Sequence, residues 1–514
     1  MSEVSQPDVA SEKEVLRWWR QKPVWVMLFL GFSAGIPILL IFSSLSLWLR
    51  EAGVNKSVVT FFSWAALGYS FKFVWAPLVD RLPIPFLSKL LGRRRGWLLL
   101  SQCAVISSIV MMAGVNPQEG LVTMAVAAVL LGFSSATQDV VIDAFRIESA
   151  NPDLQAMLSS TYIAGYRTAM IVAGAGALYL AQYFGSTKEL YSYPAWRDTY
   201  LCMAAVMSIG VITTLLISEP KFGENDDYPR STVDYVSFFV VFLFSIAALV
   251  AVFVYSPSTP DWFSGYTQTL FKFVYSVAVF CIALLAAFLV ASFSLKLGLV
   301  SAEMVNQGYQ APMLDFLSRY GKLAVWVLLL IGFYRVSDIV MGVITNVFYQ
   351  DMGYSKAEIA SVTKIFGVVM TITGSFAGGL LAIRIGVMRT LMLGAILVAV
   401  TNLLFMWLAQ AEPDITNLAI VIVADNLSQG IAIVAFIAWL SSLTNVSFTA
   451  TQYAIFSSAM TLLPKLIGGY SGTMVESIGY SYFFLFASLL GVPVIWLIHF
   501  LSSRLEVGEA LKVQ

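Results

Sequence analysis

An internal repeat divides this chain into two corresponding halves. Leu47–Val54 reads LWLREAGV, and Val347–Tyr354, 300 residues later, reads VFYQDMGY, with Gly353 at the position of Gly53. Each copy stands between two long apolar stretches, which predicts a helix, a short turn and a second helix in each half. A duplication of about 200 residues of helices is typical of transporters built from two pseudo-symmetric halves and is far too long for a solenoid repeat.

A second match falls in the fifth apolar stretch of each half. Ser159 and Arg167 are matched by Ser457 and Lys465 at a constant offset of 298 residues. The matched serine and basic residue predict that this helix has the same register in both halves.

The composition fits a protein that crosses a membrane many times. Hydrophobic residues make up 59% of the chain and charged residues 12%, whereas a soluble protein has about 25% charged residues. Cys103, Cys202 and Cys281 lie singly in apolar stretches, which predicts neither a disulfide framework nor a metal site. Basic residues cluster only where membrane topology requires them, so we expect no nucleic-acid partner. We also expect no metal and no cofactor.

Apolar windows of about 20 residues predict an all-α polytopic fold with fourteen membrane helices. Polar segments divide the chain into an N-terminal segment (1–22), a six-helix bundle (23–219), a linker with an extra hairpin (220–321), a second six-helix bundle (322–503) and a tail (504–514). The predicted helices are 24–48, 57–79, 97–114, 121–145, 154–183, 199–217, 233–255, 268–296, 322–350, 356–382, 387–409, 416–440, 451–474 and 480–502.

Basic residues in the short loops predict the orientation of the chain. The loop after the second helix contains Arg81, Lys89 and Arg93–Arg95, whereas Asn116–Gly120 on the opposite side contains no basic residue. Because cytoplasmic loops carry the excess of Lys and Arg, we expect both termini in the cytoplasm.

Two six-helix bundles with an Asp-Arg and Gly-Arg-rich loop after the second helix resemble the major facilitator superfamily. In that superfamily the loop forms a cytoplasmic latch, in which an aspartate and arginines pair across the two halves in one access state. The resemblance implies a gating role for Asp80, Arg81, Arg93, Arg94 and Arg95. The alternative is that these residues only enforce the topology.

Ionisable residues inside a membrane are costly and usually face a cavity or a partner. The helix that begins at Lys322 carries a polar stripe at steps of three and four residues. The stripe begins roughly 20 Å along the helix, near the middle of the membrane. We expect either a cavity-lining stripe or a purely structural Arg335–Asp338 pair. The stripe comprises Arg335, Asp338, Gly342, Thr345 and Tyr349, with Asn346 beside it.

The fourth helix carries a second stripe, Ser135, Asp139 and Asp143, with Arg146 one turn later. Asp139 and Asp143 lie on one face about 6 Å apart, and each disfavours ionisation of the other unless a cation intervenes. Arg167 on the next helix is a candidate for that cation. The pair predicts either a proton carrier, with Asp139 the deeper group, or a structural carboxylate held by arginine.

Other polar side chains in the predicted helices complete the expected site. Lys72 stands among aromatic residues, and Asp80 two turns away favours a buried, paired role for it. Amides, hydroxyls and cations from both halves suit a broad cavity for a bulky polar solute. The expected substrate-binding residues are Lys72, Gln138, Tyr166, Arg167, Arg335, Asn346, Tyr349, Lys364, Asp425, Asn426, Gln429 and Lys465. The expected proton-coupling residues are Asp139, Asp143 and Asp338.

Five motifs resemble the AmpG muropeptide permeases of Gram-negative bacteria, a group related more distantly to the acetyl-coenzyme A transporters. They are FKFVWAPLVDR (71–81), GRRRGW (92–97), SSATQDVVIDA (134–144), GYR (165–167) and SFTATQYAIFSS (447–458). The resemblance implies proton-driven import of N-acetylglucosaminyl-1,6-anhydro-N-acetylmuramyl saccharides, with or without peptide, across the inner membrane. Such fragments serve peptidoglycan recycling or signal β-lactamase induction.

The same resemblance assigns residues. It places the acidic positions of the family on Asp139 and Asp143 and its arginine on Arg167. The predicted hairpin within 233–296 departs from the plain twelve-helix pattern.

Other functions stay open on the sequence alone. The same scaffold suits another bulky anionic solute, such as a siderophore or a coenzyme A ester. A non-transporting membrane receptor or assembly factor is a different class, but it would not need ionisable residues inside both halves. An enzyme is not expected, because the single histidine, His499, lies near the end of the last helix. We expect a monomer whose partners are the solute, protons and the lipid bilayer.

Overall fold

The computed structural model describes residues 18–54, 62, 67–187, 190–220, 232–257, 265–468 and 471–512, and within them every regular element is helical. The chain forms two compact units. The first combines residues 1–79, 83–223 and 320–514, and the second combines residues 80–82 and 224–319. The first unit thus spans both predicted six-helix bundles, and the second spans the predicted hairpin.

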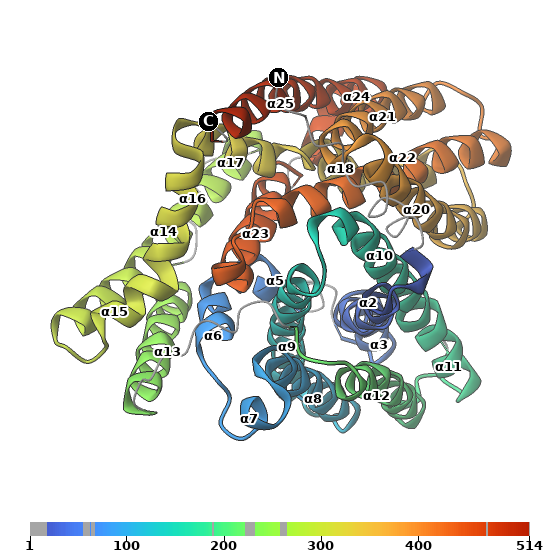
Figure 1. Cartoon of the computed structure of the whole chain (residues 1–514). Helices are drawn as coiled ribbons and strands as arrows, with labels where there is room; N and C mark the ends of the chain where they lie inside the picture. Colours follow the sequence, from blue (N-terminus) through green and yellow to red (C-terminus); the bar gives the residue numbers. More distant parts are fainter. Residues whose placement is uncertain are drawn as a thin grey trace. The chain divides into compact units, whose positions relative to one another are not determined.

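The N-terminal half of the first unit is a bundle of helices (Figure 1). Its elements are η1 (Trp18–Arg20), α2 (Lys22–Ile41), α3 (Ser43–Glu51), α5 (Leu67–Phe71), η3 (Lys72–Val74), α6 (Ala76–Arg81), α7 (Leu87–Leu91), α8 (Arg93–Ala113), α9 (Leu121–Glu148), η4 (Pro152–Leu154), α10 (Gln155–Ile171), η5 (Val172–Gly176), α11 (Ala177–Tyr183) and α12 (Tyr193–Leu216). The apolar runs of the sequence become these helices because a helix satisfies its own backbone hydrogen bonds in an apolar solvent.

Glycines bring α2 and α10 into close contact in this half. A Cβ on Gly31 of α2 would overlap the carbonyl oxygen of Tyr162. A Cβ on Gly165 of α10 would overlap the carbonyl oxygen of Leu28. Small residues at a helix crossing let two backbones approach, as is common in membrane bundles, so the glycine of the GYR motif serves packing.

The C-terminal half repeats this arrangement. Its elements are η7 (Gly321–Leu323), α17 (Ala324–Phe333), α18 (Val336–Asp351), α19 (Lys356–Ile359), η8 (Ala360–Phe366), α20 (Gly367–Ile385), α21 (Val387–Leu408), α22 (Ile415–Ser442), η9 (Val446–Phe448), α23 (Thr449–Gly468), α24 (Ser471–Leu489) and α25 (Gly491–Lys512). Gly479 interrupts α24 with φ 77° and ψ 165°, at the predicted turn between the last two helices. The helix α25 includes most of the predicted tail, because residues 504–512 contain no proline to stop it.

The two halves correspond in backbone conformation, but not at a constant offset. Gly53 and Gly353, 300 residues apart, have φ values of 82° and 93°. Gly92 and Gly386, only 294 apart, precede α8 and α21 with φ values of 94° and 88°. The helices α9 and α22, and likewise α10 and α23, also begin 294 residues apart. The N-terminal half is six residues longer between its two glycines, the stretch that contains α7.

This shift corrects the register predicted for the fifth helix of each half. Ser159 lies four residues after the start of α10, and Tyr453 lies four residues after the start of α23. Ser159 therefore corresponds to Tyr453 and not to Ser457, which was expected from the offset of 298. The serine match in the sequence was misleading because the longer loop had already changed the spacing.

Ten helices among the described residues are long and apolar enough to cross a membrane. The other four predicted spans fall where the description is partial or the apolar stretches are short. The predicted span 57–79 lies partly outside the described residues. The predicted span 451–474 is interrupted at residues 469–470, which are also outside them. The predicted hairpin forms α13 (Thr232–Tyr255) and α14 (Gly265–Lys296), with shorter apolar stretches at Val236–Val252 and Cys281–Lys296.

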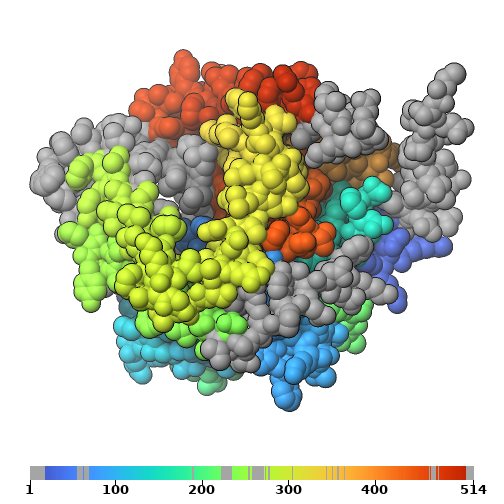
Figure 2. Space-filling model, turned by 60° about the vertical axis from the view of Figure 1, so that its left-hand side comes forward, coloured from blue at the N-terminus to red at the C-terminus, as the bar shows by residue number. Residues whose placement is uncertain are grey.

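The second unit is built on the packed helices α13 and α14, followed by α15 (Ala302–Val305), η6 (Asn306–Gln310) and α16 (Ala311–Tyr320), whose last residue belongs to the first unit. Figure 2 shows the surface of α14 in yellow-green. Large apolar side chains of α14, including Leu285, Phe288 and Phe293, are exposed. An exposed apolar surface of this kind suits contact with lipid.

Candidate solute-binding and proton-coupling site

The two halves of the first unit touch at the end where α8 begins and α9 ends, which we call the arginine end. The side chain of Ser160 in α10 donates a hydrogen bond of 2.8 Å to the carbonyl oxygen of Ser375 in α20. A Cβ on Gly379 would overlap the hydroxyl of Ser160. Figure 1 shows α10 beside α20. Small residues thus let the halves meet closely at this end.

A buried charged cluster lies on α9, close to the arginine end. Asp139 and Asp143 are each 8% exposed. The Nζ of Lys72, carried by η3, lies 3.5 Å from Oδ2 of Asp143. The charges of Lys72 and Asp143 act on Asp139, whose Oδ1 has no hydrogen-bond partner in the described part of the chain. Lys72 is therefore buried and paired, as predicted, with Asp143 as a partner where the sequence had suggested Asp80.

The cations beside the carboxylates are Lys72 and Arg146, and Arg167 occupies a different place from the one expected. The charges that act on Arg167 include those of Arg335 and Asp338 in the C-terminal half. Its guanidinium contacts the sulfur of Met170 at 3.7 Å, a weak acceptor. Because α10 turns this face toward the other half, Arg167 is a half-buried cation at the interface between the halves.

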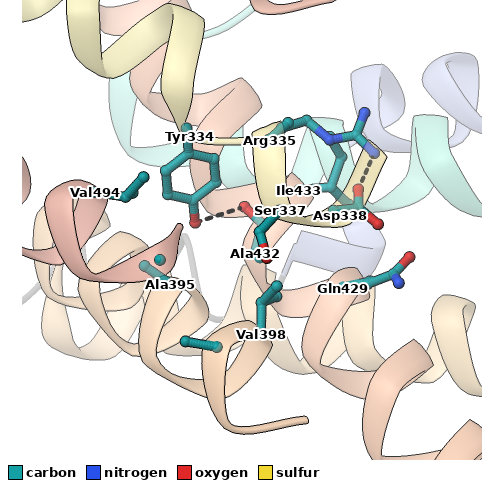
Figure 3. A pocket seen from close by; sticks show the side chains of 12 residues that line it. Tyr334, Arg335, Ser337, Asp338, Ala395, Val398, Gln429, Ala432, Ile433 and Val494 are labelled. Atoms are coloured by element: carbon teal, nitrogen blue, oxygen red, sulfur yellow. Dashed lines mark hydrogen bonds and ion pairs between the residues drawn. The ribbon is translucent and has the colours of Figure 1, made fainter. Parts of the chain in front are cut away.

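In the C-terminal half, a pocket gathers the charged residues of the predicted stripe (Figure 3). Arg335 lies between α17 and α18 and forms an ion pair with Asp338, with Nη2 and Oδ2 2.5 Å apart. Their side chains remain 25% and 17% exposed. Gln429 lines the same pocket and donates a hydrogen bond of 2.8 Å to Asp425. The charge of Asp338 also acts on Asp425, which is 5% exposed.

Other expected substrate-binding residues pack inside their own halves. Gln138 is fully buried and donates to Ser33 at 3.0 Å. Asn426 accepts a hydrogen bond of 2.8 Å from Thr371. Both amides thus make their hydrogen bonds to helices of their own bundle.

Among the remaining expected residues, the structure describes the side chains of the two tyrosines. Tyr349 is 3% exposed and belongs to the core of the C-terminal half. Tyr166 is half-buried beside Tyr162. The side chains of Asn346, Lys364 and Lys465 lie outside the described part of the chain.

Two of the arginines expected to form a latch across the halves, Arg94 and Arg95, make contacts within the N-terminal half. Arg94 forms an ion pair with Glu148 at the end of α9. The guanidinium of Arg95 donates to the carbonyl oxygens of Thr214 and Leu215. Because α8 and α9 are antiparallel neighbours, the start of one meets the end of the other. Arg94 and Arg95 thus join helices of one half, and Asp80 and Arg81 belong to the second unit.

Glu219 completes this arrangement beyond the end of α12. Its carboxylate accepts hydrogen bonds from the backbone N–H groups of Arg94 and Arg95, at 2.7 and 3.0 Å. Burial raises the pKa of Glu219, and the two N–H groups partly offset that shift. The carboxylate satisfies backbone donors that the first turn of α8 leaves open.

Arg146 was not among the expected site residues. It is fully buried and contacts Asp143 of its own helix and Ser441 of the other half. The signal in the sequence was the spacing of three residues between Asp143 and Arg146, which permits an ion pair on one helix face.

Comparison with known proteins supports this description. The family model described as Acetyl-coenzyme A transporter 1 matches residues 23–145. The "Putative transporter AmpG 4" of Rickettsia felis is 29% identical over 478 residues, which are 93% of this chain and 96% of that protein. The "Anhydromuropeptide permease" of Escherichia coli K12 is 28% identical over 495 residues, which are 96% of this chain and 82% of that protein.

Solved structures show the same fold. The proton:xylose symporter XylE, bound to 6-bromo-6-deoxy-D-glucose, aligns with a TM-score of 0.58 at 13% identity, covering 93% of this chain and 94% of XylE. The major facilitator transporter FucP, in its outward conformation, aligns with a TM-score of 0.54 at 10% identity, covering 93% of this chain and 98% of FucP.

The described part of the chain thus has the fold of the major facilitator transporters, with ten helices long and apolar enough to cross a membrane. Along nearly its whole length the chain is similar to proteins named as AmpG transporters and anhydromuropeptide permeases. The resemblance inferred from the motifs is thus confirmed.

Proposed function

We propose that the protein is a proton-coupled importer of anhydro-muropeptides across the bacterial inner membrane. The observation that carries the proposal is the placement of two clusters of charged side chains, one in the N-terminal half and one shared by both halves. Asp139 and Asp143 lie with Lys72 in the N-terminal half, and Arg167 interacts electrostatically with Arg335 and Asp338 across the halves. The printed name of the Escherichia coli homologue supports the solute class.

The cross-half group suits a bulky anionic solute. Arg167 and Arg335 bring two positive charges to one interface, and Asp338 neutralises only one of them. A solute carboxylate would supply the missing negative charge, and Gln429 would offer an amide to its polar groups. Lys364 and Lys465, assigned from the sequence alone, would add two further cations.

The carboxylates of α9 suit the proton-coupling role. Asp139 is nearly buried and its Oδ1 lacks a hydrogen-bond partner in the described residues, so a proton would lower the cost of its burial. Asp143 and Asp338 already have cationic partners. In the mechanism we propose, solute and proton bind from the periplasm, and the halves then rock to close outside and open inside.

The arrangement in the membrane is part of the same proposal. We place two bundles of six helices and the inserted pair α13–α14 in the inner membrane, with both termini in the cytoplasm and the protein monomeric. The arginine end then faces the cytoplasm, because the loop that precedes α8 holds the cluster Arg93–Arg95.

Uptake into liposomes tests the function. The purified protein would be reconstituted, and uptake of labelled anhydro-disaccharide measured with and without an inward proton gradient. Uptake stimulated by the gradient is the expected result. Gradient-independent uptake would contradict proton coupling, and no uptake by vesicles that contain folded protein would contradict the solute assignment.

A coenzyme A ester is the second candidate solute. The observation in its favour is the match of residues 23–145, which include Asp139 and Asp143, to the acetyl-coenzyme A transporter family. Both solutes are bulky anions, so the same charged site would accept either. Competition separates them: excess unlabelled acetyl-coenzyme A should leave muropeptide uptake unchanged if the main proposal holds.

A further inference from the structure

Arg146, near the end of α9, is a fully buried cation with partners in both halves of the first unit. Its Nη2 donates to Oδ1 of Asp143 at 3.3 Å, and its Nη1 donates to the hydroxyl of Ser159 at 3.0 Å, both within the N-terminal half. The same Nη1 donates to the hydroxyl of Ser441 at 2.9 Å. The guanidinium carbon lies 5.2 Å from the ring centre of Tyr453, within range of a cation–π interaction.

Two of these four partners belong to the C-terminal half. Ser441 is the next-to-last residue of α22, and Tyr453 lies in the second turn of α23. A buried guanidinium is stable only while its charged and hydrogen-bonding partners stay in place. Separation of the halves at the arginine end would remove Ser441 and Tyr453 from Arg146, so this residue favours the closed arrangement.

Arg146 contacts equivalent positions of the two halves, but the position equivalent to Arg146 itself is not an arginine. Ser159 and Tyr453 occupy equivalent positions, 294 residues apart, in α10 and α23. Arg146 thus lies between matching positions of the two halves. Its own equivalent, 294 residues later in α22, is Leu440, which has no charge. The arginine that makes the contact is supplied by the N-terminal half, the half that carries the buried carboxylate pair.

Asp143 connects Arg146 to that pair. Its Oδ1 accepts from Arg146, and its Oδ2 faces Lys72 at 3.5 Å. Asp139 lies one turn earlier on the same helix. The other groups whose charges act on Arg146 are Tyr162 of α10 and Tyr453 of α23. Asp143 is the carboxylate that binds the guanidinium. The presence or absence of this contact therefore determines whether Arg146 points toward the other half.

We propose that Arg146 is a positioning residue that couples the carboxylates of α9 to closure of the halves at the arginine end. The inference rests on the proposed function, because rocking transport requires the halves to separate there when solute is released. While Asp143 holds the guanidinium, Arg146 binds Ser441 and Tyr453 and the halves stay closed. When Asp143 releases it, the halves separate.

Pulsed electron paramagnetic resonance between two spin labels tests the proposal. The labels would be attached through Asp153→Cys and Ser447→Cys, exposed equivalent positions of the two halves at the arginine end. The background is the full chain with Cys103, Cys202 and Cys281 replaced by serine. With Arg146 intact we expect mainly a short distance, and with Arg146→Gln the larger share of the population should move to longer distances.

Two serine variants form a matched pair. Ser441→Ala and Ser159→Ala each remove one hydroxyl that accepts from Nη1 of Arg146, but only Ser441 belongs to the other half. Ser441→Ala should lengthen the distance, and Ser159→Ala should not. An equal response to both, or none to Ser441→Ala, would overturn the proposal. If Arg146→Gln fails to fold, these two serine variants still test the proposal.

Asp143→Asn tests the link to the carboxylates. It should lengthen the distance as Arg146→Gln does, and the double variant should go no further than Arg146→Gln alone. A short distance retained in Asp143→Asn would refute the coupling. The labels report the distance without any solute, so a protein that fails to import muropeptides but shows these shifts would disprove only the proposed solute.

Discussion

The guanidinium of Arg94 and the carboxylate of Glu148 form an ion pair whose side chains are only 2% and 1% exposed. The Nη2 and Nε of Arg94 both donate to this carboxylate, with Nη2 2.5 Å from Oε1 and Nε 2.9 Å from Oε2. The pair joins the start of α8 to the end of α9. An arginine of the loop motif therefore stabilises one half of the protein.

We predict that Glu148→Gln destabilises the protein by about 3–5 kcal/mol, because removal of one partner leaves the other charge buried and unpaired. Thermal unfolding in detergent measures the change. Asp198→Asn serves as the control, because Asp198 pairs with Arg197 on the surface, with side chains 42% and 46% exposed, and solvent screens such pairs. An equal loss of stability in the two variants would show that burial does not increase the contribution of the Arg94–Glu148 pair to stability.

Asp139→Asn should abolish accumulation of solute against a gradient while sparing exchange of solute across the membrane. An amide keeps the shape of the carboxyl group but cannot gain or lose the proton that drives uphill transport. Counterflow in proteoliposomes measures exchange, and uptake under a proton gradient measures accumulation. Loss of both activities in a folded variant would refute a purely coupling role for Asp139.

Arg335→Ala should raise the half-saturation concentration for solute by about 10- to 100-fold, because hydrogen bonds between charged groups contribute about 1.5–3 kcal/mol. The maximal rate under a proton gradient should fall less. Initial uptake rates at a series of solute concentrations measure both. Arg319→Ala is the matched control: Arg319 also pairs with an aspartate of its own helix, Asp315, but lies in the second unit. An unchanged half-saturation in Arg335→Ala would remove Arg335 from the binding site.

Glu219→Gln should change how stability depends on pH. Burial raises the pKa of Glu219, so the folded protein holds this proton more tightly than the unfolded chain. Ionisation therefore favours unfolding as pH rises through the raised pKa. Relative to Glu219→Gln, the wild-type protein should lose stability as pH rises above about 4, as measured by thermal unfolding at several pH values.

Glu358 provides the opposite case. The hydroxyl and backbone N–H of Ser355 both donate to its carboxylate, at 2.7 and 2.8 Å, and they lower its pKa. The stability that Glu358 contributes is present above the pKa of the unfolded chain and is lost as pH falls through the lowered pKa. Relative to Glu358→Gln, the wild-type protein should therefore gain stability as pH rises to about 4 and change little above that pH. The same sign in both variants would contradict the burial effect at Glu219.

Gly165→Ala should destabilise the protein by about 1–3 kcal/mol, because its Cβ would overlap the carbonyl oxygen of Leu28 and push α10 away from α2. Gly342→Ala is the control, since a Cβ there meets no atom within 4 Å. The control should keep the stability of the wild-type protein or exceed it slightly, because alanine favours a helix. Thermal unfolding of both variants in the same detergent gives the comparison.

Several site residues illustrate why prediction from the sequence stopped short. Gln138 and Asp139 are adjacent, yet Gln138 bonds to Ser33 inside the N-terminal half and Asp139 belongs to the charged cluster with Lys72. Neighbouring helical positions point about 100° apart, so burial of one says little about the other. The spacing of polar residues identified helices that carry buried charged groups, but it did not identify which face of each helix meets which neighbour.

The sequence by itself predicted the all-helical membrane fold, most of its membrane helices and the duplication. Apolar runs form helices in a membrane because no other backbone can satisfy its hydrogen bonds there, and these local patterns are visible in one dimension. The tertiary structure decided the pairing of charges: Lys72 with Asp143, Arg94 with Glu148, and Arg146 with both halves. Those partners lie up to 295 residues apart along the chain, and only the packing of the helices brings them together.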